Sequence, residues 1–82
     1  MTLEPVRCLV VDDEPSIRTV LSRLLRSQGH ACREAASGDE ALALLAREPA
    51  ELVLSDIHMP GMDGTELLAE IRRLYPDTAV VM

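Results

Sequence analysis

Two hydrophobic runs of this sequence end in aspartate. The run at residues 8–11 is followed by Asp12 and Asp13, and the run at residues 52–55 is followed by Asp56. Both runs are short, rich in valine and leucine, and free of polar alternation, which is typical of strands buried on both faces. If they are neighbouring parallel strands, three carboxylates meet at the sheet edge where open α/β sheets bind ligands.

Three carboxylates in one place repel one another. Two unit charges ~4 Å apart cost about 4 kcal/mol at an effective dielectric constant near 20, so a proton or a cation must offset the repulsion. Mg²⁺ suits the site because it uses one or two carboxylates together with water and phosphate oxygens. In phosphoryl chemistry an aspartate can be the nucleophile. Asp56 is the candidate because it stands alone, whereas Asp12 and Asp13 form a pair suited to hold the ion.

Strands and helices alternate along the rest of the sequence, which predicts an α/β fold with a parallel sheet. Pro15 suits the first position of a helix, Gly29 suits its end, and Ser37 with Glu40 has the form of a capping box. The predicted elements are strands at 8–11, 31–35, 52–55 and 79–82, with helices at 15–28, from 38 to Pro49, and after the loop at 57–64.

The first predicted helix carries apolar residues at helical spacing, and we expect this stripe to pack on the sheet. Arginines lie on the other side of this helix, and we expect them to form a solvated face. The apolar residues are Ile17, Val20, Leu21, Leu24 and Leu25, and the arginines are Arg18, Arg23 and Arg26.

Composition limits the classes of function. Eighty-two residues make one domain at most, and a net charge of -6 opposes binding to nucleic acid or to an anionic membrane. No segment approaches the ~18 apolar residues that span a bilayer, and the N-terminus has no basic leader, so we expect a cytoplasmic protein.

Cys8 and Cys32 lie in predicted strands and do not have the spacing of a metal site. We expect them to be reduced and packed, although a disulfide between neighbouring strands is sterically possible.

Three sequence features together resemble the receiver domain of two-component response regulators. They are the acidic segment at residues 10–15 (Val-Val-Asp-Asp-Glu-Pro), the isolated Asp56, and the loop at residues 59–64 (Met-Pro-Gly-Met-Asp-Gly). The resemblance covers nearly the whole chain. It implies a flavodoxin-like doubly wound parallel sheet, with the four strands present here in the order 2-1-3-4.

The resemblance also implies roles for individual residues. Asp56 would accept a phosphoryl group from a sensor histidine kinase or a phosphotransfer domain, and part of the arginine set would contact that partner. Asp12, Asp13 and Asp56 would hold Mg²⁺, or Mn²⁺ in its place, and the backbone carbonyl of His58 would be a further ligand. The His58 side chain is expected to face solvent, at a position that borders the phosphoryl group and influences its lifetime.

The sequence departs from the family pattern at its C-terminal end. Family members carry a serine or threonine after the fourth strand and a lysine after the fifth, and neither position is present. We therefore expect residues 1–82 to be the N-terminal two-thirds of a single receiver domain, lacking the last helix, strand and helix. Apolar surface on the first and third strands and along the outer edge of the fourth should then be uncovered, which favours a homodimer or a swapped oligomer.

The leading hypothesis is a signalling switch that is controlled by phosphorylation and is not a turnover enzyme. Two alternatives remain open. One is a pseudo-receiver that serves only as a protein interaction module. The other is a metal-dependent hydrolase with an aspartyl nucleophile, such as a haloacid-dehalogenase-type phosphatase. That family has an Asp-x-Asp pattern after its first strand, which Asp12-Asp13-Glu14 lacks.

Overall fold

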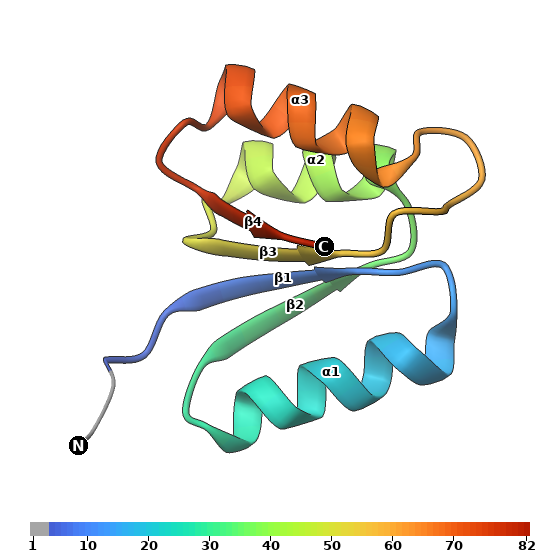
Figure 1. Ribbon diagram of the computed structural model, residues 1–82. Coiled ribbons are helices and arrows are strands. Elements are labelled where there is room, and N and C mark those ends of the chain that lie inside the picture. The colour runs from blue at the N-terminus through green and yellow to red at the C-terminus, as the bar shows by residue number, and fades with distance from the viewer. Residues whose placement is uncertain (1–3) are drawn as a thin grey trace.

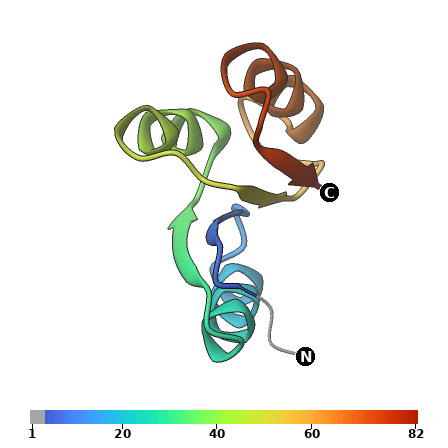
Figure 2. The same ribbon diagram turned by 90° about the vertical axis from the view of Figure 1, so that its left-hand side faces the viewer.

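A four-stranded parallel sheet forms the centre of the protein, with its strands in the order β2-β1-β3-β4. The structure is a computed structural model that describes residues 4–82. Helix α1 lies on one face of the sheet, and α2 and α3 cover the other (Figures 1 and 2). This arrangement confirms the predicted fold class. The elements are β1 (Arg7–Val11), α1 (Pro15–Ser27), β2 (Ala31–Ala35), α2 (Gly38–Arg47), β3 (Leu52–Ser55), α3 (Gly64–Leu74) and β4 (Ala79–Val81).

Local signals in the sequence set the ends of the helices. Proline begins α1, and Gly29, just beyond its end, adopts a φ of 91°, in the left-handed region that favours glycine. The Ser37 hydroxyl accepts a hydrogen bond from the backbone N–H of Glu40 at 3.1 Å, as the predicted cap requires. The first two predicted helices therefore begin and end within two residues of their expected positions, and α3 begins where the predicted loop ends.

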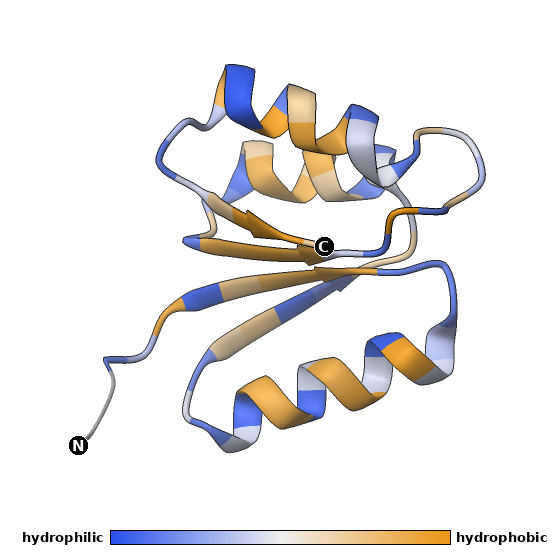
Figure 3. Cartoon of the chain, in the orientation of Figure 1, coloured by the Kyte–Doolittle hydropathy of each residue, from blue (hydrophilic) through white to orange (hydrophobic). Residues whose placement is uncertain are grey.

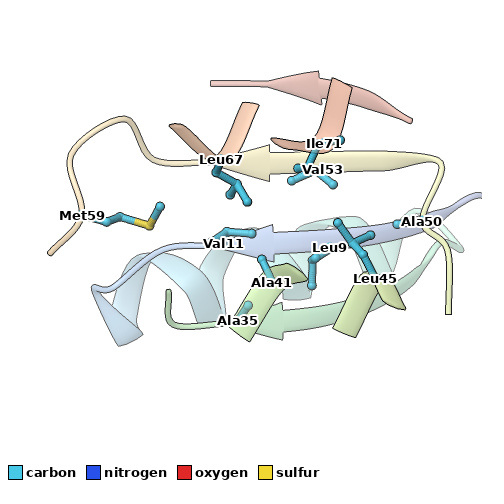
Figure 4. Packing of buried hydrophobic residues seen from close by; sticks show 10 residues of the cluster. All are labelled: Leu9, Val11, Ala35, Ala41, Leu45, Ala50, Val53, Met59, Leu67 and Ile71. Atoms are coloured by element: carbon cyan, nitrogen blue, oxygen red, sulfur yellow. The ribbon is translucent and has the colours of Figure 1, made fainter. Parts of the chain in front are cut away.

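The main hydrophobic core lies between the sheet and the pair α2 and α3 (Figure 4). Leu9 and Val11 of β1 point into it, so Cys8 and Val10, which alternate with them, point toward α1. Cys8 and Val10 are 1% and 0% exposed. The core residues are Leu9, Val11, Ala35, Ala41, Leu45, Ala50, Val53, Met59, Leu67 and Ile71.

The prediction that the apolar stripe of α1 packs on the sheet is wrong for three of its residues. Ile17, Val20 and Leu24 are 49%, 64% and 56% exposed. Hydrophobic segments accordingly recur along the ribbon of α1 in Figure 3. Within α1, which the structure describes in full, the one buried residue is Ser22, whose hydroxyl donates to Glu34 on β2 at 3.0 Å.

Glu34 on β2 binds the polar side of α1 to the sheet. Its carboxylate lies 3.5 Å from Nε of Arg18 and 3.7 Å from Nη2 of Arg26, in addition to the bond from Ser22. These three α1 residues are spaced four apart and share one face of the helix. The expectation that the arginines of α1 form a solvated face is therefore wrong for Arg18, whose side chain is only 19% exposed.

The expected uncovered strands are found only in part. The expectation is wrong for β1, where residues 8–11 are all buried, because α1 and the main core cover its two faces. On β3, Leu52 and Leu54 are half-buried. Exposed apolar surface is present at the end of β4, where Val81 is 51% and Met82 42% exposed.

The two cysteines lie directly opposite each other on neighbouring strands, Cys8 on β1 and Cys32 on β2. Both are free thiols, as expected. Among residues 4–82, no helix combines the length and the apolar character that crossing a membrane requires.

Candidate functional site

The register of the sheet brings the predicted acids together. Val11 pairs with Ser55, so Asp12 and Asp56 follow at the same level of neighbouring strands. The backbone N–H of Asp56 donates to the carbonyl of Val11 at 3.0 Å and continues this pairing. One carboxylate oxygen from each of Asp12, Asp13 and Asp56 lies within 4.8 Å of the others. The structure thus gathers all three acids at the carboxyl edge of the sheet.

The three carboxylates differ in how firmly they are held. Asp12 is 6% exposed, and its Oδ1 accepts a hydrogen bond from the backbone N–H of Glu14 at 2.9 Å. Asp13 is exposed, and Asp56 is partly exposed. The Asp12 carboxylate is therefore held in place just before α1, while the other two carboxylates are accessible to an ion and to a phosphoryl donor.

The donor set fits a hard divalent cation. Mg²⁺ prefers oxygen ligands about 2.1 Å away, so two directly bound oxygens lie at most about 4.2 Å apart. Oxygens gathered within 4.8 Å need only a small side-chain adjustment or an intervening water to meet that limit. The acidic cluster is therefore compatible with Mg²⁺.

His58 lies in the loop that follows Asp56. Its backbone N–H is 3.4 Å from Oδ1 of Asp56, which is a long hydrogen bond. Its side chain is exposed, as predicted. The proposed ligand role of the His58 carbonyl stays a prediction.

The sequence places Gly64 at the end of the predicted loop and does not reveal the close backbone contact that it makes. Gly64 does begin α3, behind the N-cap Asp63, but its φ is not positive. Its backbone N–H donates to the carbonyl of Ile57 at 2.8 Å, and a Cβ at this position would collide with the backbone of Asp56. The sequence offered one signal of this contact, which is a glycine at the start of a helix, where the backbone conformation does not require glycine.

Comparison with known families decides what kind of domain this is. The family described as the response regulator receiver domain matches residues 8–82. The chain belongs to this family. Receiver domains act in two-component systems, where they interact with histidine kinases or phosphotransfer partners, and they are generally not turnover enzymes.

Individual relatives agree with this assignment. The chain is 47% identical over 73 residues to the DNA-binding transcriptional regulator NtrC of Salmonella typhimurium, a match that covers 89% of this receiver domain and 16% of that regulator. The receiver domain of NtrX from Brucella abortus superposes with a TM-score of 0.88 at 42% identity, covering 92% of this chain and 64% of that one. The chain therefore spans a small part of NtrC and less than two-thirds of the NtrX domain.

A further solved structure resembles the chain equally well. The response regulator protein TrrA from Thermotoga maritima, crystallised in complex with Mg²⁺ and BeF, gives a TM-score of 0.88 at 41% identity. The match covers 93% of this receiver domain and 66% of TrrA.

Proposed function

We propose that this receiver domain accepts a phosphoryl group on Asp56, with Mg²⁺ held by Asp12 and Asp13. The observation that carries the proposal is the convergence of three carboxylates at the carboxyl edge of the sheet, in a member of the receiver family. The buried Asp12 supplies a fixed ligand, and the partly exposed Asp56 supplies a nucleophile that a partner protein can reach.

The chemistry is transfer of a phosphoryl group from a phosphohistidine. A carboxylate oxygen of Asp56 attacks phosphorus, the phosphorus–nitrogen bond breaks, and the imidazole nitrogen keeps the bonding electron pair. When bound, Mg²⁺ neutralises charge on the transferring group. Asp13 is exposed and adds negative charge beside Asp12, which strengthens cation binding. The backbone carbonyl of His58 is proposed as a further oxygen ligand.

The proposed partner is a sensor histidine kinase or a phosphotransfer domain in the cytoplasm. Exposed apolar residues of α1 lie on the helix that begins immediately after the acidic pair, and they offer such a partner a surface beside the site. The net charge of -6 disfavours nucleic-acid contact by this segment. Phosphorylation would bias a conformational equilibrium that an output reads.

Intact-mass spectrometry after incubation with acetyl phosphate tests the proposal. We expect a gain of one phosphoryl group that requires Mg²⁺ and is lost in Asp56→Ala. The Asp39→Ala variant removes an exposed aspartate from the first turn of α2 and should be phosphorylated like the wild type. No gain in any condition would instead support a pseudo-receiver that acts only by protein contact.

A further inference from the structure

The side chain of Arg18 joins the acidic site to the edge strand of the sheet. Its Nη1 donates to the backbone carbonyl of Asp12 at 2.7 Å, and its Nε lies 3.5 Å from Oε1 of Glu34. The arginine comes from α1, Glu34 from β2, and Asp12 from the end of β1. One guanidinium from α1 therefore contacts groups from two other segments, the end of β1 and β2.

The bond from Arg18 completes the fixation of Asp12. The backbone N–H of Asp12 donates to the carbonyl of Ala35 at 3.1 Å, and its Oδ1 accepts from Glu14 at 2.9 Å. The Asp12 carbonyl, held by Arg18, belongs to the peptide unit that links Asp12 to Asp13. Fixing that peptide plane fixes the direction in which the second carboxylate leaves the backbone.

We propose that Arg18 is a positioning residue for the Mg²⁺ site, acting through the Asp12 carbonyl. This inference rests on the proposed function. Residues that orient metal ligands typically change metal affinity by about 10–100-fold when they are replaced. The positive charge of Arg18 alone would oppose cation binding, but Glu34 lies beside it and offsets that charge. The geometric effect should therefore exceed the electrostatic one.

Arg26 provides a matched control in the same helix. Its Nη2 lies 3.7 Å from Oε2 of Glu34 and donates to the backbone carbonyl of Cys32 at 2.8 Å. Like Arg18, Arg26 links α1 to Glu34 and to a main-chain carbonyl, but that carbonyl lies away from the three aspartates of the site. Arg26→Gln removes the same charge and the same type of helix contact without touching Asp12.

The experiment is a Mg²⁺ titration of the full 82-residue chain, followed by amide NMR, in the wild type, Arg18→Gln and Arg26→Gln. We expect Arg18→Gln to weaken Mg²⁺ binding about tenfold. Arg26→Gln should bind like the wild type. Equal affinities in Arg18→Gln and the wild type, or tighter binding in Arg18→Gln, would overturn the proposal, since tighter binding would mean that Arg18 acts only by charge.

Two further measurements keep the result decisive. If glutamine at position 18 unfolds the chain, Arg18→Lys carries the test, because lysine keeps the charge but not the fork that contacts both Asp12 and Glu34. It should bind Mg²⁺ several-fold more weakly than the wild type, and wild-type affinity would overturn the proposal.

If the wild type binds no Mg²⁺, the proposed function fails, and hydrogen exchange of the Asp13 amide in the metal-free chain still tests Arg18. Exchange should be faster in Arg18→Gln than in Arg26→Gln, and equal rates would overturn the positioning role.

Discussion

The backbone of Gly64 lies so close to the backbone of Asp56 that no side chain fits between them. A Cβ at Gly64 would overlap the carbonyl oxygen of Asp56 and lie 2.8 Å from Cα of Ile57. Because the obstacle is main chain, neither partner can move aside by changing a rotamer. The first residue of α3 therefore supports the strand end that carries the proposed phosphoacceptor.

Gly64→Ala should destabilise the fold and disturb the site together. Overpacking against rigid structure typically costs about 1–3 kcal/mol, and the displaced segment here contains Asp56. Urea unfolding and acetyl phosphate labelling measure the two effects. Gly38→Ala is the control, since it also changes the first residue of a helix but its Cβ meets the flexible Met62 side chain at 3.0 Å. Equal behaviour of the two variants would contradict this account.

Ser37→Ala should destabilise the protein by about 1 kcal/mol, because α2 loses the hydroxyl that accepts from the Glu40 N–H. Ser37→Asn keeps an acceptor at the N-cap and should retain most of the stability. Chemical denaturation of both variants provides the measurement. A Ser37→Asn protein as unstable as Ser37→Ala would show that the serine contributes something other than a cap.

The exposed apolar face of α1 should cause self-association. Val20 and Leu24, at 64% and 56% exposure, would bury surface against a second copy. Sedimentation velocity should show mass rising with concentration, and the combined Val20→Gln and Leu24→Gln changes should reduce this effect. Ala69→Gln places the same side chain at an exposed position on α3 and should leave association unchanged. A wild-type chain that stays monomeric at every concentration would contradict the prediction.

Alkaline pH should destabilise the protein through its thiols. Burial raises the pKa of Cys8 above its ordinary value of 9.0, and burial is also the main cause that raises the pKa of Cys32. A pKa raised in the folded state gives stability that is present below the ordinary value and lost as pH rises through the folded value. The free energy of unfolding should fall above that ordinary value, with a shallower slope in the Cys8→Ala and Cys32→Ala double variant. Parallel slopes would exclude the thiols as the cause.

The meeting of the acids could be predicted because it depends on local patterns. Short apolar runs indicate buried strands, and Asp12 and Asp56 end two of them, so a parallel pairing leaves few other positions for the carboxylates. The face that α1 turns to the sheet could not be predicted in this way. Helical periodicity separates an apolar face from a polar one, but it does not show that residues of the polar face bind Glu34, which belongs to another element.

The roles of Arg18 and Gly64 were missed for a similar reason. Arg18 contacts a main-chain carbonyl, and Gly64 contacts a main-chain segment, so neither contact has a side-chain partner that a motif could indicate. Such roles become visible only when the path of the backbone is known.

The most direct test of the account is to locate the phosphoryl group chemically. Borohydride reduces an aspartyl phosphate to homoserine, so the chain is labelled with acetyl phosphate and Mg²⁺, reduced, digested and mapped by mass spectrometry. We predict homoserine at Asp56 alone, and only when Mg²⁺ is present during labelling. Homoserine at Asp12 or Asp13, or labelling without conversion at Asp56, would contradict the assignment of Asp56 as the phosphoacceptor.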